Sequence, residues 1–146
     1  MKRFVLDTNI YVAADRNVVN AEELVAFYAA SLPATYLHAV VAQELLLGAV
    51  DARRGAAIRA AYVRPFESRG RIVTPSFANW ARSGEIVAQL VRDKVISPGG
   101  FGRSFLNDVL LAVSCRMFGL TLVTNNLRDF ERIRRVEKFD FIPPWP

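Results

Sequence analysis

Short apolar runs alternate along the chain with longer segments in which apolar residues return every three or four positions. The short runs are rich in aliphatic and aromatic residues, which favour buried strands, whereas the longer segments have the period of an amphipathic helix. The pattern predicts strands over 3–6, 35–37, 71–74 and 121–124, an edge strand over 136–141, and helices over 9–14, 21–31, 40–50, 53–64, 76–93, 104–118 and 127–133.

Local signals mark the ends of several predicted helices. Asn20 is a suitable N-cap for the helix over 21–31, which Pro33 ends because proline cannot continue a helix. Ser104 is expected to cap the helix that Gly119 terminates. The glycine-rich segment 97–102 is typical of a flexible loop.

Strands that alternate with helices indicate an α/β fold, here one domain over 1–146 with a mostly parallel sheet and helices on both faces. Ligands of such sheets bind beyond the carboxyl ends of the strands. Asp7 directly follows the first predicted strand, and Thr124, Asn125 and Asn126 directly follow the fourth. We therefore expect both polar groups at one functional edge.

Asp7, Glu44 and Asp108 are acidic residues in apolar surroundings. Acids are rarely buried unless they are paired or bind a metal ion, so their positions suggest one oxygen-rich metal site. Each also has an ordinary explanation. Asp7 can cap the next helix (a role that Thr8 or Asn9 can also fill), Glu44 can reach water from a helix edge, and Asp108 suits the positive end of a helix dipole.

Asp129 is a fourth acidic candidate, five residues after Thr124. Its ordinary explanation is a solvated charge near Arg132, and Asn126 is an alternative polar group for the same site. The remaining acidic residues of the chain have the pattern of surface charges.

Carboxylates without histidine or cysteine partners describe a site for a hard cation, Mg²⁺ or Mn²⁺. Such an ion lowers the pKa of a bound water and neutralises charge on a phosphodiester transition state. Asn9 and Thr124 are candidates to hold a carboxylate or a water in place.

The net charge is +5, and the chain contains 16 arginines but only 3 lysines. Arginine binds phosphate bidentately and stacks on bases, so nucleic acid is a candidate partner. A genomic preference for arginine codons explains the high arginine content equally well. The apolar fraction of 52% exceeds the usual value slightly, and an apolar surface for a partner or a second copy would account for it.

The chain lacks the histidine and cysteine residues that other catalytic mechanisms require. His38 is the only histidine, which excludes the acid–base pair of a metal-independent ribonuclease, and it is expected to be structural. Cys115 is the only cysteine and is expected in the core. No apolar run reaches the roughly 18 residues of a membrane span, and the N-terminus lacks the cleavage site of a signal peptide, so we expect a cytoplasmic protein.

Four motifs in order resemble the PIN-domain ribonucleases, and most closely the toxins of VapBC-type toxin–antitoxin modules. The resemblance covers nearly the whole chain. Its motifs are Leu6-Asp7-Thr8-Asn9, Glu44-Leu45-Leu46-Leu47-Gly48, Asn107-Asp108-Val109-Leu110-Leu111-Ala112, and Leu122-Val123-Thr124-Asn125-Asn126-Leu127-Arg128-Asp129-Phe130.

The resemblance implies Mg²⁺- or Mn²⁺-dependent cleavage of RNA. It matches Asp7, Glu44 and Asp108 to the family's core acids and leaves the fourth acid at Asp129 or at the position of Asn126, which is an amide here. It also implies a homodimer, or a hetero-oligomer with a VapB-type antitoxin whose C-terminal segment covers the site.

Three other functions compete with a toxin. The chain can be a nucleic-acid-binding module with a residual acidic pocket, or a housekeeping PIN nuclease outside any toxin–antitoxin module. A phosphatase or receiver domain built around Asp7 is the third, but Thr8-Asn9 does not supply the second acid or hydroxyl that such phosphatases place two residues on.

Overall fold

The computed structural model describes all 146 residues as a five-stranded parallel sheet flanked by helices. The strands lie in the order β3-β2-β1-β4-β5, and every neighbouring pair is parallel. This confirms the predicted α/β architecture. The strands are β1 (Phe4–Leu6), β2 (Thr35–His38), β3 (Ile72–Val73), β4 (Thr121–Val123) and β5 (Phe141–Ile142).

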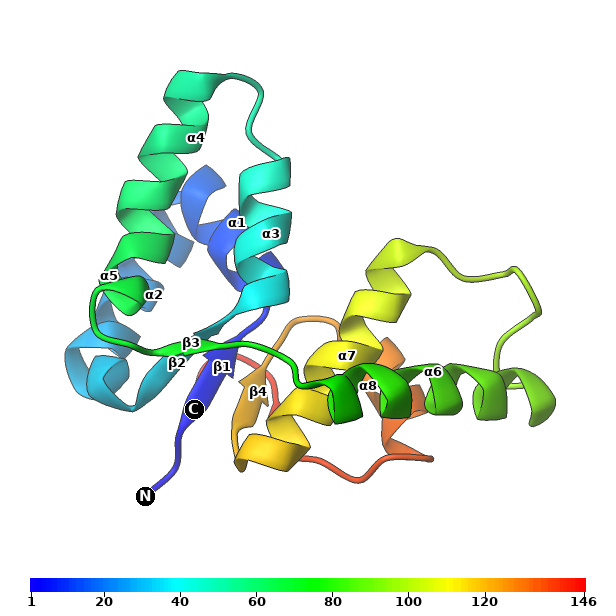
Figure 1. The fold of residues 1–146 in the computed structure, drawn as a ribbon. Helices are drawn as coiled ribbons and strands as arrows, with labels where there is room; N and C mark the ends of the chain where they lie inside the picture. The colour runs from blue at the N-terminus through cyan, green and yellow to red at the C-terminus, as the bar shows by residue number, and fades with distance from the viewer.

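The helices form two groups beside the sheet (Figure 1). Those that link β1 to β2 and β2 to β3 pack together, as do those that follow β3. The first group contains α1 (Thr8–Arg16), α2 (Val18–Ser31), the 3₁₀ turn η1 (Leu32–Ala34), α3 (Ala39–Leu47), α4 (Ala52–Ile58), the π-helical turn η2 (Arg59–Val63) and α5 (Arg64–Glu67); the second contains α6 (Phe77–Arg92), α7 (Arg103–Phe118) and α8 (Leu127–Arg134).

The core is a single cluster of 30 buried apolar residues between the sheet and both groups. The central strands contribute Val5, Leu6, Leu122 and Val123, all without solvent exposure. A continuous apolar strand is what a sheet covered on both faces requires. No helix has the length and apolar character needed to cross a membrane.

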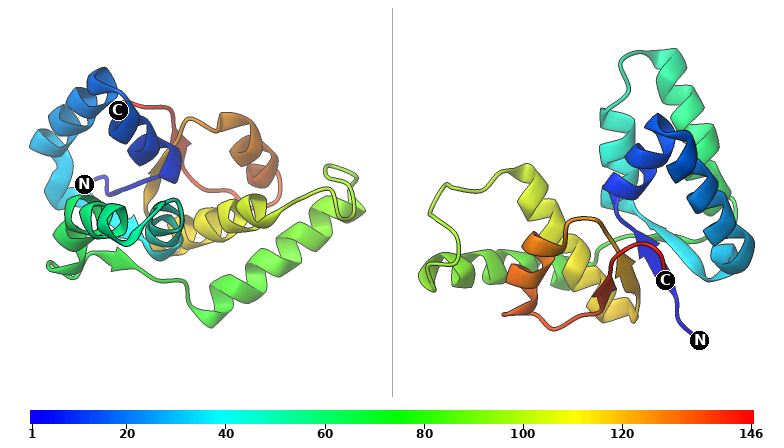
Figure 2. Two further views of the ribbon diagram at one scale, coloured as in Figure 1. Left: turned by 90° about the horizontal axis from the view of Figure 1, so that it is seen from above. Right: turned by 180° about the vertical axis from the view of Figure 1, so that it is seen from behind.

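The connection between α6 and α7 extends away from the rest of the molecule (Figure 2). The two helices pack against each other, with α6 running outward and α7 returning toward the sheet. The loop that joins them contains the predicted glycine-rich segment 97–102. The amino end of α7 is thereby brought to the carboxyl edge of the strands.

Two predicted N-caps are wrong. Asn17, not Asn20, caps α2, and its Oδ1 accepts a hydrogen bond from the backbone N of Asn20. The helix therefore begins at Val18, before its predicted start, and includes Val18 and Val19, although both are exposed. Ser104 lies inside α7, which begins at Arg103 directly after Gly102.

Other boundaries also differ from the prediction. The helix predicted over 40–50 ends at Leu47, with Gly48 as its C-cap. The helix predicted over 53–64 is divided into α4, the π turn and α5. The edge strand expected over 136–141 is confined to Phe141–Ile142, and Val136 to Asp140 form an irregular connection from α8 to the sheet.

Candidate active site

Asp7 lies where β1 ends and α1 begins, and only 4% of its surface is exposed. It caps α1, with Oδ1 accepting from the backbone N of Thr8 at 2.8 Å. Its Oδ2 accepts from Thr124 Oγ1 at 2.7 Å and from Asn9 Nδ2 at 3.1 Å. Asp7 is therefore both the helix cap and a buried carboxylate held by the two side chains predicted to hold it.

Glu44 is half-buried on α3, and its carboxylate faces the same edge of the sheet. Its Oε1 accepts from Thr8 Oγ1 at 2.6 Å, and its Oε2 accepts from Asn107 Nδ2 at 3.4 Å. These contacts join α3 to the starts of α1 and α7. Glu44 does not simply extend from a helix edge into water, because donors from two other helices bind it.

Asp108 lies on the first turns of α7 and is 8% exposed. Asn126, just after β4, donates through Nδ2 to Asp108 Oδ2 at 3.4 Å and to Asp129 Oδ2 at 3.1 Å. Asp129 also pairs with Arg132, from which its Oδ1 lies 3.5 Å. The Asn126 amide thus connects both acids, and it does so as a donor rather than as an oxygen ligand.

Burial and mutual repulsion act on the two most buried acids. Burial, followed by the charges of Asp7, Glu44 and Asp129 in that order, raises the pKa of Asp108 to about 8. Burial also raises the pKa of Asp7, the hydrogen bonds from Thr124 and Thr8 partly offset this, and Glu44 adds to the rise. Asp108 therefore lies within electrostatic range of the other three acids, and Asp7 within range of Glu44.

All four candidate ligands supply oxygen, which fits Mg²⁺ or Mn²⁺ and not a soft metal. No three acidic, histidine or cysteine side chains converge closely enough to hold one ion directly. The acids can still raise the pKa of Asp108, because charges interact over distances longer than a metal–oxygen bond. The amides of Asn107 and Asn126 bind carboxylate oxygens at this edge. The carboxylate oxygens of the four acids fit a divalent cation, whose positive charge offsets the repulsion between the carboxylates.

A profile of the PIN domain family matches residues 4–136. The chain belongs to the PIN domain family. The family consists of nucleases, and the matched range contains every acid predicted for the site. A search of curated proteins found none that matches this chain.

Solved structures of toxin–antitoxin complexes share the fold of this PIN domain. The DNA-bound VapBC complex of Salmonella typhimurium is 26% identical, with 98% of each chain covered and a TM-score of 0.72. VapBC2 of Rickettsia felis, bound to a promoter fragment, is 23% identical, with 98% of each chain covered and a TM-score of 0.67. FitAcB of Neisseria gonorrhoeae is 19% identical, covers 97% of this chain and 98% of its own, and has a TM-score of 0.70.

The PIN domain also uses two residues that the sequence prediction did not assign to the site. Thr8 and Asn107 both donate to Glu44, one through a hydroxyl and the other through an amide. Each is the sequence neighbour of a predicted acid, Asp7 or Asp108. Their position beside these acids was the only feature of the sequence that could have indicated a role in the site. It does not show which carboxylate each side chain contacts.

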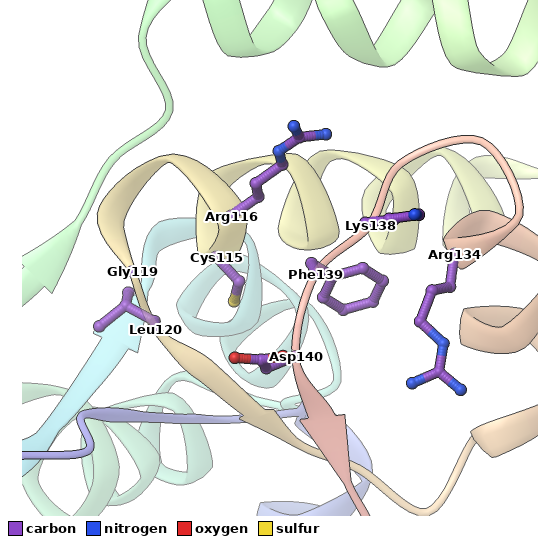
Figure 3. Close-up of a pocket in the computed structure, with 8 residues that line it drawn as sticks. All are labelled: Cys115, Arg116, Gly119, Leu120, Arg134, Lys138, Phe139 and Asp140. Atoms are coloured by element: carbon purple, nitrogen blue, oxygen red, sulfur yellow. The ribbon is translucent and has the colours of Figure 1, made fainter.

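Another cavity of the PIN domain, of about 540 Å³, lies at the opposite edge of the sheet, before β4 and β5 begin (Figure 3). It contains none of the predicted site residues. Two of its cations are already paired, Arg116 with Glu137 at 2.8 Å and Arg134 with Glu131. Cys115 is fully buried, as predicted. His38, which was expected to be structural, is also fully buried and caps α3.

Proposed function

We propose that this PIN domain is a metal-dependent endoribonuclease and the toxin component of a type II toxin–antitoxin module. The observation that supports it is the meeting of Asp7, Glu44, Asp108 and Asp129 at the carboxyl edge of a parallel sheet. Buried acids that repel one another destabilise a fold unless a function requires them.

In this proposal Asp7, Glu44, Asp108 and Asp129 bind Mg²⁺, for which Mn²⁺ can substitute. Some of the four would bind through waters on the ion, because no three of the acids lie close enough to ligate one ion directly. When bound, the cation lowers the pKa of the attacking water and neutralises charge on the phosphodiester. The protein's part is orientation. Thr124 and Asn9 fix one carboxylate oxygen of Asp7. Thr8 fixes Glu44, and Asn126 connects Asp108 to Asp129.

The partners in the proposal are RNA and a VapB-type antitoxin, in a homodimer or a hetero-oligomer in the cytoplasm. The VapBC and FitAcB complexes that share this fold support an antitoxin partner. Exposed apolar side chains support a protein interface where they gather in a patch, because monomeric domains rarely expose large apolar patches. Leu47, Val50, Phe77 and Trp80 are each more than half exposed.

Replacement of Asp7 by asparagine tests the proposal. Asparagine caps helices as well as aspartate does, so Asp7→Asn should fold but bind the cation poorly. We expect RNA cleavage to fall about 100-fold or more, as for other groups that stabilise a transition state. Cleavage of a labelled single-stranded RNA is measured with Mg²⁺ or Mn²⁺ and with EDTA.

The matched control is Asp51→Asn, which alters the exposed aspartate that caps α4. Its cleavage rate should equal that of the unaltered protein. Equal cleavage by Asp7→Asn, or undiminished cleavage in EDTA, would show that the proposed chemistry is wrong.

One observation favours a second candidate, a nucleic-acid-binding module with a residual acidic pocket. Asp129 is bound by Arg132 and Asn126, which compete with a cation for its oxygens. A titration with Mn²⁺ separates the two candidates. If the protein binds no Mn²⁺ and its affinity for RNA is unchanged, the binding module is supported. If it cleaves RNA in a metal-dependent way but no antitoxin gene lies nearby, a housekeeping nuclease is supported.

A further inference from the structure

A second cavity adjoins the carboxylate site, and we call it the tyrosine pocket. It lies between α1, α3 and the α4–η2 segment, helices that stand together in Figure 1. Its volume is about 110 Å³, whereas a cavity for one water needs roughly 10–15 Å³. The lining residues that matter here are Tyr11, Asp15, Arg16, Glu44, Arg54 and Tyr62.

Glu44 belongs to both the pocket and the carboxylate site. On one side it accepts hydrogen bonds from Thr8 and Asn107, and on the other it forms part of the pocket wall. A group in the tyrosine pocket therefore lies beside the proposed metal centre. In a nuclease, the atoms next to the reacting phosphate belong to the neighbouring nucleotides.

A π-helical turn positions the aromatic wall of the pocket. The turn η2 (Arg59–Val63) interrupts the helix between α4 and α5, and such single turns are common at functional sites. It directs Tyr62 toward the fully buried Tyr11, with ring centroids 5.6 Å apart and an interplanar angle of 61°. Tyr62 itself is only half-buried, so it remains available to a ligand.

The polar wall places a hydrogen-bond acceptor beside a donor. Asp15 forms an ion pair with Arg54, and its Oδ1 lies 3.4 Å from the hydroxyl of Tyr62. The side chains of Asp15 and Arg54 are 32% and 41% exposed, so both can exchange solvent for a ligand. Two acids, Asp15 and Glu44, balance two arginines, and the pocket suits a neutral polar group better than a phosphate.

We propose that the tyrosine pocket binds one unpaired base of the RNA, from a nucleotide next to the scissile phosphate. The inference rests on the proposed function and adds a specificity site to it. An aromatic side chain and an arginine are the usual partners of an unstacked base. Guanine matches the polar wall best, because its edge presents two adjacent N–H groups to Asp15 and a carbonyl oxygen to Arg54.

A peptide segment is the competing occupant, and the pocket is less suited to it. An apolar anchor side chain would leave the charges of Asp15 and Arg54 facing apolar atoms without new partners. A base edge instead satisfies both groups. The pocket holds about 110 Å³, so it takes a small group rather than an extended segment.

The test compares Asp15→Asn with Glu67→Gln. The second variant is the control, because Glu67 forms a similarly exposed ion pair with Arg59 outside the pocket. Four RNA oligonucleotides that differ only in the base beside the cleavage site are cleaved with Mg²⁺. The same four are also bound to the protein in EDTA, so that binding is measured without cleavage.

We expect the unaltered protein and Glu67→Gln to prefer one base, guanine, by about 10-fold or more, which is the discrimination typical of a bidentate contact. Asp15→Asn should bring the four affinities and the four rates together. An unchanged preference in Asp15→Asn overturns the inference, as does an absence of any preference in the unaltered protein. Loss of affinity for a co-purified protein partner with an unchanged base preference assigns the pocket to a peptide instead.

The two readouts separate this inference from the proposed function. Base-selective binding that depends on Asp15, without metal-dependent cleavage, supports the pocket and refutes the nuclease. Metal-dependent cleavage with no dependence on Asp15 supports the nuclease and refutes the pocket.

Discussion

Asp108 shows most clearly how a single residue of this site can destabilise the folded protein. Its carboxyl group is buried, and three other acids lie near enough to raise its pKa. The folded protein therefore favours the protonated form, whereas the unfolded chain ionises near the ordinary value of 3.8. A group of this kind makes stability depend on pH and on any cation that neutralises the site.

Asp108 should lower the stability of the metal-free protein as the pH rises. Between pH 3.8 and about pH 8 the folded state keeps a proton that the unfolded state releases, so the stabilisation present in acid is lost progressively toward pH 8. From pH 5 to pH 8 the loss is on the order of 4 kcal/mol from this group. Urea unfolding in EDTA at a series of pH values measures it.

Asp108→Asn removes the titrating group, so its stability should exceed that of the unaltered protein by a margin that grows with pH. Asp140→Asn, at an exposed acid, is the control and should show no such margin. A constant difference between Asp108→Asn and the unaltered protein across the pH range would contradict the prediction.

Helix ends decide much of the geometry at the scale of elements. Asp7 and His38 cap α1 and α3, and these caps place Glu44 and the start of α1 at the same edge. The sequence predicted the helices themselves from their period. It misplaced the cap of α2 because Asn17 and Asn20 lie close together and only one of them can cap the helix. It misplaced the cap of α7 because Gly102, which has no capping side chain, precedes that helix.

Gly119 should be required at the end of α7 for its backbone conformation. Its φ is +64°, in the left-handed region, and an added Cβ would also approach Arg3 Nη2 at 3.4 Å. We expect Gly119→Ala to lower the free energy of unfolding by about 1–2 kcal/mol. Chemical denaturation measures the change.

The matched control is Gly84→Ala within α6. No atom lies within 4 Å of the added Cβ there, and alanine favours a helix over glycine. This variant should gain about 0.5–1 kcal/mol. Destabilisation of both variants by the same amount would show that the left-handed conformation is not the cause.

Glu137 connects the second helix group to the C-terminal segment at the scale of the whole molecule. It is 5% exposed, and its Oε1 lies 2.8 Å from Arg116 on α7 and 3.3 Å from Arg82 on α6. In the sequence, nothing distinguishes Glu137 from the acids predicted to lie on the surface. Its burial depends on the turn that replaces the predicted edge strand.

Glu137→Gln should destabilise the fold, because it removes the charge that two arginines share at a buried position. Hydrogen bonds to charged groups contribute about 1.5–3 kcal/mol, and we expect a loss in that range by thermal or urea unfolding. Glu85→Gln is the control, since Glu85 pairs with the same Arg82 but is 66% exposed, and its loss should stay below about 1 kcal/mol. Equal losses in the two variants would contradict the role assigned to burial.

The sequence by itself determined the α/β class, the first four strands and the acids placed in apolar surroundings, because period and local composition are properties of neighbouring residues. It also determined that Asp7 and Asn126 follow strands whose ends share an edge. These predictions needed no contact between distant segments. Membership of the PIN domain family agrees with them.

Only the tertiary structure decided which donors hold which acids. The hydroxyl of Thr8 donates to Glu44, although its backbone N–H donates to Asp7. Asn126 bridges Asp108 and Asp129, and the buried Glu137 pairs with arginines of two helices. The tyrosine pocket likewise depends on a π turn that no local period predicts. Such contacts join residues far apart in the chain, and the packing of whole elements sets them.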